Sequence, residues 1–412
     1  MKEIRKNNTI IGFIVMLLLS SIIYIPGFIS LQKLFLFLSI FLSLLFFLFK
    51  LFKREIYFRD IKYVLLFFIL LMFFSYLSIF SSNYQYLSFF RWVIIFLYSF
   101  VFIVIVANDS KPYLSLDISI KSIVIFASFL SFYGVFINVF GSVKSFDGYL
   151  VGSINILGLE LMQCTNEGGR ICSLTANPNT FASLLVFALP CLAYLFYQNT
   201  VSRIYIGLSF FIMIYALVLT DSRASLISVL ASLFFYFIFK SKNIKDFIIK
   251  FIFIVVLFIP VLIYIVSFFY KGRSGLSGRS DAWVLLFEDF NSNLIFGSGF
   301  GVSSESVLQA GGVSISGHNI YLTLLSEIGL LGFTSFVCLF FVFLYYSVRL
   351  LKSGSSSFIN IGALTFTISI GLFFHQFFET ILFRFTALHF IWLFFSLNSI
   401  LIYNTRKRYK SV

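Results

Sequence analysis

The sequence predicts an all-α polytopic membrane protein, and its composition gives the main reasons. Hydrophobic residues make up 60% of the 412 residues, charged residues only 11%, and 61 residues are phenylalanine. Soluble domains are typically about 45–50% apolar and about 25% charged, so a soluble core cannot hide this much apolar surface. We therefore expect one integral membrane domain over residues 1–412, because the apolar segments follow one another without a long soluble insert.

The apolar segments have the length of transmembrane helices. A helix needs about 20 apolar residues to cross a bilayer, and it satisfies its own backbone polar groups there. About 12 segments qualify, and they are too densely apolar for barrel strands, which alternate in period two. The first has no small-x-small cleavage site, so we expect a permanent span rather than a signal peptide. The predicted spans are 10–29, 33–50, 61–80, 88–107, 118–141, 178–198, 203–220, 224–239, 248–270, 318–347, 358–378 and 385–403.

The basic residues are distributed unevenly between the loops. A net charge of +14 is compatible with nucleic-acid binding, but lysine and arginine cluster in alternate loops. Cytoplasmic loops of membrane proteins are enriched in these residues, so the pattern predicts a multi-pass protein with both termini in the cytoplasm and no nucleic-acid partner. The clusters are the N-terminus, 50–62, 240–250, 349–352 and the C-terminal TRKRYK.

Two loops on the opposite, periplasmic side are long, 142–177 and 271–317. The first contains Cys164 and Cys172, which in an oxidising periplasm either form a disulfide or remain two thiols. Lysine and arginine are usually enriched on the cytoplasmic side, so we expect several of the basic residues on this periplasmic face to have a function. An individual arginine on this face can also have no function. The basic residues on this face are Lys33, Arg91, Lys144, Arg170, Arg223, Lys271, Arg273, Arg279 and Arg384.

The large loop 271–317 is predicted to carry a short amphipathic helix at the membrane surface. In DAWVLLFEDF, helical spacing places Trp283 and Phe287 on one apolar face. Arg279 stands beside the start of this helix, where backbone N–H groups and a guanidinium suit an anionic oxygen such as phosphate. The glycines of FGSGFG (297–301) are expected to form tight turns, because nucleotide binding requires a preceding strand and a GxGxxG spacing.

Arg223 lies in TDSRAS, a very short outer turn between two predicted spans. A charge so close to hydrocarbon is costly unless it finds a partner. One interpretation is a salt bridge to Asp221, and the other is an arginine that faces a cavity and binds a diphosphate.

The stretch GHNIYLTLLSE places His318 and Asn319 where a polar loop becomes a span. A histidine there can accept a proton from a hydroxyl, and the asparagine can cap the helix or hold a sugar hydroxyl. The alternative is a polar pair that simply ends the span. His375 and Glu379, four residues apart, allow an ion pair or one edge of a metal site, but two ligands do not make a metal site. We expect Glu379 and Arg384 to line the outer cavity.

Several of these motifs together resemble the O-antigen polymerase and O-antigen ligase superfamily. GRSDAW, NLIFGSGFG and GHNIYLTLLSEIGLLGF are similar to its large outer loop and following span, and Phe296 stands where proline is common. LTANPNTF is similar to its Asn-Pro-Asn helix entry, and LTDSRAS to its arginine-containing turn. The resemblance covers about 175–335 and rests on the combination of motifs.

The resemblance implies a metal-independent membrane glycosyltransferase without a cofactor, in the bacterial inner membrane. Such enzymes transfer glycan from undecaprenyl diphosphate to an acceptor hydroxyl at the periplasmic face. Arg223, Arg279 and Arg273 would bind the diphosphate, because arginines must neutralise the leaving group where no metal does. His318 would be catalytic, and Asn319 would contact the acceptor or a sugar. The expected partners are the lipid-linked glycan, membrane lipids and a candidate chain-length regulator protein.

Three functions remain open from the sequence. We favour a polymerase of lipid-linked O-antigen or capsular repeat units over an O-antigen ligase that transfers finished glycan to lipid A core. A polysaccharide transporter or flippase fits the number of spans, but transporters usually carry acidic residues or broken helices near the midplane. In this sequence nearly all acidic residues lie in loops or at the ends of spans, and Glu327 is an exception. The enzyme hypothesis requires His318, Arg223 and Arg279 to meet at one outer cavity.

Overall fold

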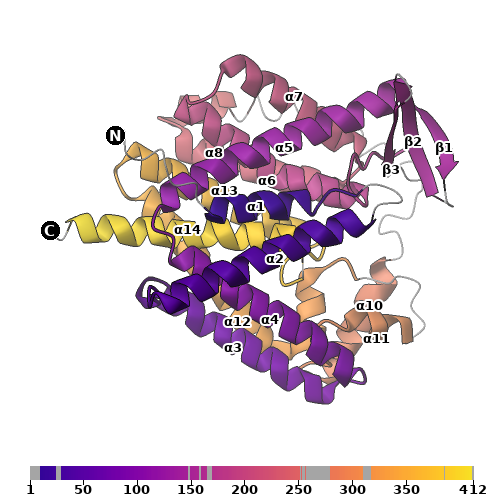
Figure 1. The fold of residues 1–412 in the computed structure, drawn as a ribbon, viewed down its shortest axis with the longest axis vertical. Coiled ribbons are helices and arrows are strands. Elements are labelled where there is room, and N and C mark those ends of the chain that lie inside the picture. The colour runs from indigo at the N-terminus through magenta and orange to yellow at the C-terminus, as the bar shows by residue number, and fades with distance from the viewer. Residues whose placement is uncertain are drawn as a thin grey trace.

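The computed structural model describes most of the chain and shows that it is largely helical (Figure 1). Nine helices within the described residues are long and apolar enough to cross a membrane. The predicted all-α membrane fold is therefore confirmed in its class. The residues that the structure describes are 10–24, 29–146, 149–156, 159–164, 169–250, 252, 256, 279–309, 317–384 and 386–410.

The long helices follow the predicted spans closely. They are α2 (Ile29–Phe52), α3 (Lys62–Leu77), α4 (Gln85–Ala107), α5 (Pro112–Phe140), α6 (Pro178–Gln198), α8 (Arg223–Lys240), α12 (Ile320–Leu351), α13 (Ser356–His375) and α14 (Ala387–Lys410). The short helices η2 (Arg59–Ile61) and η3 (Ser78–Ser81) flank α3. Two more apolar helices are shorter, α1 (Ile10–Ser20) and α7 (Arg203–Leu219).

The exact number of spans stays a prediction. Helix α1 has only 11 residues, fewer than the predicted 10–29, and a helix of that length rises only about 17 Å. The predicted span 248–270 lies almost entirely outside the described residues.

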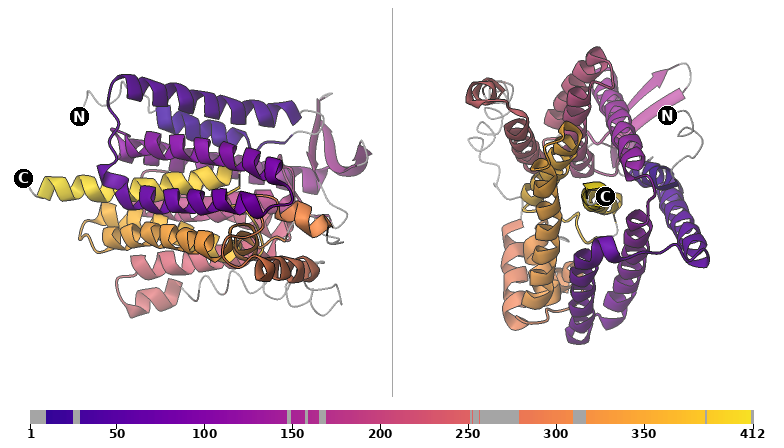
Figure 2. Two further views of the ribbon diagram at one scale, coloured as in Figure 1. Left: turned by 90° about the horizontal axis from the view of Figure 1, so that it is seen from below. Right: turned by 90° about the vertical axis from the view of Figure 1, so that its left-hand side faces the viewer.

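Helix α14 forms the centre of the bundle. Seen along its axis, the other long helices surround it (Figure 2, right), and it packs against α1, α4, α5, α12 and α13. Its side chains Phe390, Trp392 and Phe394 are fully buried. The end of α14 lies at the opposite end of the bundle from the sheet and from α10 (Arg279–Ser292) and α11 (Ser303–Gln309) (Figures 1 and 2).

A three-stranded antiparallel sheet, which the sequence did not predict, occupies the first long loop. Its strands are β1 (Ser142–Phe146), β2 (Tyr149–Ile156) and β3 (Leu159–Cys164), paired in the order β1-β2-β3. Two hydrogen bonds attach it to α5: Tyr133 Oη donates to the Met162 carbonyl at 2.7 Å, and Gln163 Nε2 donates to the Gly134 carbonyl at 3.2 Å. The predicted disulfide stays a prediction, because the side chain of Cys164 lies outside the described ones, whereas Cys172 is buried.

Helix α12 is broken near its N-terminal end, at Gly329. This residue has φ 63° and ψ −171°, which interrupts the helical hydrogen bonds. The segment 294–299 docks on the break: Ser298 N donates to the Ser326 carbonyl at 2.8 Å, Gly299 N to the Glu327 carbonyl at 3.0 Å, and Leu330 N to the Leu294 carbonyl at 2.8 Å. The freed backbone groups thus find partners within the protein, as a membrane environment requires.

The FGSGFG stretch forms the predicted tight turns, with positive φ at Gly297, Gly299 and Gly301. A Cβ at Gly297 would overlap the backbone at Glu327. Asp289 of α10 accepts hydrogen bonds from the hydroxyls of Ser298, at 2.5 Å, and Ser326. The turn and the broken helix together therefore fix the position of α10 against α12.

Candidate functional site

Glu379, in the loop between α13 and α14, joins three parts of the chain that are distant in sequence. Its Oε1 accepts a hydrogen bond from Asn179 Nδ2 at 2.6 Å and lies 3.4 Å from Arg279 Nη2. Its Oε2 lies 3.2 Å from His318 Nδ1. The side chain is 13% exposed, so these contacts are only weakly screened by solvent. One carboxylate therefore couples the predicted catalytic histidine to a predicted anion-binding arginine.

Four helices begin around this carboxylate. Asn179 and Arg279 lie in the first turns of α6 and α10, and His318 lies two residues before the start of α12. Arg223 is the first residue of α8, and its charge acts on Arg279. The unsatisfied N–H groups at a helix N-terminus carry partial positive charge, so the assembly creates a region of positive potential.

The backbone at His318 is held in the left-handed region, at φ 45°. A non-glycine residue seldom adopts this conformation, and it persists only where neighbouring contacts enforce it. Trp283 Nε1 donates to the Gly317 carbonyl at 2.6 Å, and Ile320 N donates to the Gln376 carbonyl at 3.0 Å. These hydrogen bonds attach the residues on both sides of His318 to α10 and to the end of α13, and they thereby fix the direction of the His318 side chain.

Asn319 has the capping role that the sequence offered as one alternative. Its Oδ1 accepts hydrogen bonds from Tyr321 N at 3.0 Å and Leu322 N at 3.1 Å. The residue is buried, with 6% exposure. This bonding satisfies two N–H groups that α12 would otherwise leave open.

The arginines lie close enough to influence one another. Burial lowers the pKa of Arg279, the negative charge of Glu379 raises it, and the positive charges of Arg170 and Arg223 lower it further. The net pKa is below the usual value. Three guanidinium groups thus share one neighbourhood, and Arg223 and Arg279 are brought together as predicted, whereas Arg273 lies outside the described residues.

Arg170 and Asn179 are site residues that the sequence prediction missed. Arg170 Nε donates to the Thr220 carbonyl at 2.8 Å, and its Nη2 donates to Asn179 Oδ1 at 2.8 Å. This bond orients the amide of Asn179 so that its Nδ2 faces Glu379. Two features of the sequence indicated these residues. Arg170 is a basic residue on the predicted periplasmic face, where basic residues are usually rare, and Asn179 belongs to the Asn-Pro-Asn helix entry. In that entry Asn177 caps α6 by accepting from Thr180 N at 2.8 Å.

A cavity of about 370 Å³, lined by both polar and apolar groups, adjoins His318 and Glu379. Of the three residues expected to meet at one outer cavity, only His318 lines it, whereas Arg223 and Arg279 are not among its described lining residues. As expected, Glu379 lines it, but the expectation for Arg384 was wrong. Arg384 instead contacts the buried Glu327 at 2.7 Å, because the loop turns it toward the break in α12. The lining residues are Ser21, Ile22, Gln32, Lys33, Leu36, Asn177, Asn179, Thr180, Ser183, His318, Glu379, Thr380, Ile381, Thr386, Ala387 and Leu388.

His375 is buried among hydroxyl groups rather than paired with Glu379. Its Nε2 lies 2.9 Å from Ser225 Oγ and 3.3 Å from Ser183 Oγ. Within the described residues, no three histidine, cysteine or acidic side chains are grouped in a way that suits a metal ion.

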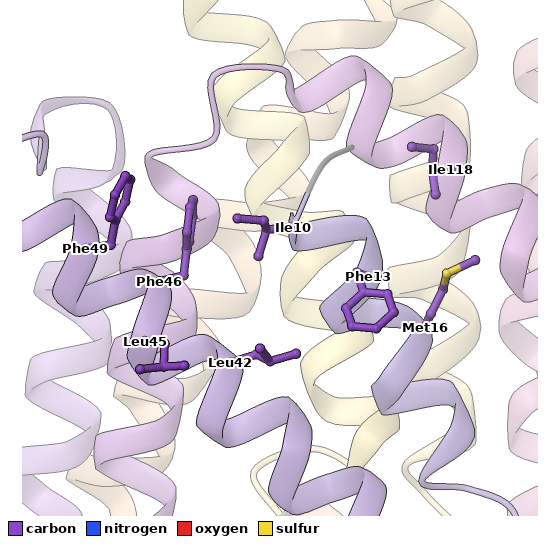
Figure 3. A pocket seen from close by; sticks show the side chains of 8 residues that line it. All are labelled: Ile10, Phe13, Met16, Leu42, Leu45, Phe46, Phe49 and Ile118. Atoms are coloured by element: carbon purple, nitrogen blue, oxygen red, sulfur yellow. The ribbon is translucent and has the colours of Figure 1, made fainter. Parts of the chain in front are cut away.

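A larger cavity of about 740 Å³ lies between α1, α2 and α5 (Figure 3). Its lining is apolar and includes Phe13, Met16 and Phe46. None of the side chains described in this lining can transfer a proton or bind a phosphate.

Comparison with known families supports the resemblance that the motifs indicated. Residues 208–337 match a family model described as O-Antigen ligase. The match contains Arg223, Arg279 and His318, and it is consistent with the O-antigen polymerase and ligase superfamily, so the resemblance is confirmed. Glu379, Arg170 and Asn179 lie outside the matched residues. No curated protein matches the chain.

Proposed function

We propose that the chain is a polymerase of lipid-linked O-antigen or capsular repeat units. It transfers glycan from undecaprenyl diphosphate to an acceptor sugar hydroxyl at the periplasmic face of the bacterial inner membrane. The observation that carries this proposal is the position of Glu379 between His318, at 3.2 Å, and Arg279, at 3.4 Å. The proposed proton acceptor, His318, and the proposed anion-binding residue, Arg279, are thereby joined in one site.

His318 is the general base of the proposed reaction. In this proposal the neutral ring carries its proton on Nδ1, beside Glu379, and Nε2 is the basic nitrogen that takes the proton of the acceptor hydroxyl. His318 takes the hydroxyl proton as the acceptor oxygen attacks the anomeric carbon of the donor. The bond from that carbon to the diphosphate oxygen breaks, and its electron pair leaves with the diphosphate. A positioned general base typically contributes about 100-fold or more to the rate.

The arginines stabilise the departing diphosphate. Arg279, Arg223 and Arg170 influence one another electrostatically, and Arg223 and Arg279 stand at helix N-termini. Guanidinium groups bind phosphate oxygens in a bidentate manner, and helix N-termini add further N–H donors. Arg273 is a further expected contact. In this proposal the arginines supply the positive charge, so the reaction proceeds without a metal.

The orientation of the protein follows from the placement of charge. The basic loop 50–62 and the C-terminal TRKRYK are assigned to the cytoplasm by the positive-inside rule. The sheet, α10 and α11 lie at the other end of the bundle from the end of α14 (Figure 1). We therefore place loops 142–177 and 271–317, and the site, in the periplasm.

O-antigen ligase is the second candidate, and the description of the matching family favours it. The two activities share the donor and the chemistry and differ in the acceptor. Purified protein is incubated with a synthetic lipid-linked repeat unit, with and without lipid A core, and each reaction is run both with and without EDTA. Polymer formed without lipid A core supports the polymerase, and transfer only in its presence supports the ligase. Loss of all products in EDTA contradicts the metal-independent reaction, and no product with either acceptor contradicts both functions.

A further inference from the structure

We propose that the cavity of about 370 Å³ beside His318 is the subsite for the acceptor sugar, separate from the place where the donor diphosphate binds. This inference rests on the proposed function and assigns the two substrates to two sides of Glu379. The inference is based on the side chains that line the cavity and on the nearby arginines that do not line it.

The walls of the cavity carry groups suited to sugar hydroxyls. Hydroxyls and amides come from the start of α6, from the loop after α13, and from the outer ends of α1 and α2. The apolar side chains of Ile22, Leu36 and Leu388 complete the lining. A few polar groups placed on an apolar wall are typical of small-molecule sites, and this volume falls in their usual range of about 300–1,000 Å³. Neutral donors and acceptors match hydroxyls, and an apolar wall matches the C–H face of a sugar ring.

The three arginines near Glu379 are not part of the cavity wall. None of Arg170, Arg223 and Arg279 is among the described residues that line the cavity, although all three lie near Glu379 or its partner Asn179. The charged groups in the lining are Glu379 and Lys33, with His318 beside them. Apart from Lys33, the cations that a diphosphate needs therefore lie outside the cavity, whereas a sugar has its hydrogen-bonding partners inside it.

His318 stands at the boundary between the two regions. It lines the cavity and also contacts Glu379, which contacts Arg279. A hydroxyl seated in the cavity is within reach of the imidazole, while the anomeric carbon of the donor is held from the arginine side. This arrangement presents the acceptor oxygen opposite the leaving diphosphate, as an in-line displacement requires.

Gln32 and Thr380 make the test specific, because both line the cavity and neither contacts Glu379, His318 or an arginine in the hydrogen bonds described. Gln32→Leu and Thr380→Val each remove hydrogen-bonding capacity with little change in size. Gln85→Leu is the matched control, because Gln85 also lies at the start of a helix, α4, and is remote from the cavity.

The assay uses purified full-length protein, a synthetic lipid-linked repeat unit as donor, and an alkyl glycoside of the same repeat unit as acceptor. The glycoside has no diphosphate, so it accepts glycan but cannot donate it. We expect KM for the glycoside to rise about three- to tenfold in Gln32→Leu and Thr380→Val, the usual effect of losing one neutral hydrogen bond. KM for the donor, and its slow hydrolysis by water, stay at the wild-type values, as do all parameters of Gln85→Leu.

An increase in donor KM, or an unchanged acceptor KM in both variants, overturns the assignment of the cavity while the proposed function stands. A wild-type protein that transfers glycan to no acceptor overturns the proposed function and this inference with it.

Discussion

Oε2 of Glu379 lies 3.2 Å from Nδ1 of His318, a contact that joins the loop after α13 to the segment just before α12. The contact orients the ring, and Glu379 also reaches Arg279 through its other oxygen. A carboxylate that accepts from one nitrogen of a histidine selects the tautomer in which the other nitrogen is the base. In the proposed reaction Glu379 therefore positions His318, and the predictions below test this role.

Glu379→Gln removes the charge and keeps the shape. The amide cannot accept from Asn179, Arg279 and His318 at once, so the ring of His318 loses its fixed orientation. We expect kcat to fall about 100-fold with little change in protein level. Steady-state transfer assays on purified protein measure this effect. A variant with wild-type kcat shows that the carboxylate does not support catalysis.

Arg279→Lys tests whether the guanidinium geometry matters or only its charge. Lysine keeps the positive charge but loses the planar donors that bind two phosphate oxygens together. We expect a fall in kcat/KM for the donor of about 100-fold. The control is Arg203→Lys, because Arg203 is an exposed residue at the start of α7. Equal activities of the two variants contradict the assigned role.

Asn179→Asp tests the link between Arg170 and Glu379. The new carboxylate stands next to that of Glu379, where the amide now donates at 2.6 Å, so two negative charges meet. Repulsion displaces Glu379, and we expect kcat to fall at least tenfold, since one misplaced catalytic contact is typically worth about 10–100-fold. Asn243→Asp is the matched control, because Asn243 also caps a helix by accepting from Asp246 N, it does not line the cavity, and an aspartate caps as well as an asparagine does. The hypothesis is wrong if both variants lose activity to the same extent.

Gly329→Ala tests the break in α12. A side chain at φ 63° is strained, and its Cβ would overlap the carbonyl of Ile295. We expect a loss of stability of about 3 kcal/mol, seen as a lower Tm in detergent. Gly354→Ala separates strain from overlap, because Gly354 has φ 78° and no atom near the added Cβ. Its expected cost is only about 1 kcal/mol, so equal Tm values in the two variants contradict the docking of 294–299 on the break.

The sequence predicted the residues whose chemistry is unusual for their location. Arg223 was considered because a charge so near hydrocarbon is costly without a partner, Arg279 because it stands beside the start of an amphipathic helix, and His318 because it lies where a polar loop becomes a span. Arg170 and Asn179 were not assigned, because their roles arise from a contact between two loops that hydropathy and local spacing do not encode. Glu379 was placed in the cavity but not recognised as the link, since that link depends on residues far apart in sequence.

Two features of the fold were also beyond sequence patterns. The strands β1–β3 are short and lie in a loop that was judged by its length alone. The break at Gly329 lies inside a long apolar run, and a glycine there is equally compatible with a continuous helix. It was the packing of 294–299 against that run that decided the conformation.

The most direct test of the account replaces His318. Purified His318→Ala is compared with wild type in a single-turnover assay, with the lipid-linked donor bound and a glycan acceptor in excess. The account predicts unchanged donor binding and a transfer rate lower by about 100-fold or more. A wild-type transfer rate, or a normal ladder of chain lengths in cells that express only His318→Ala, would contradict it.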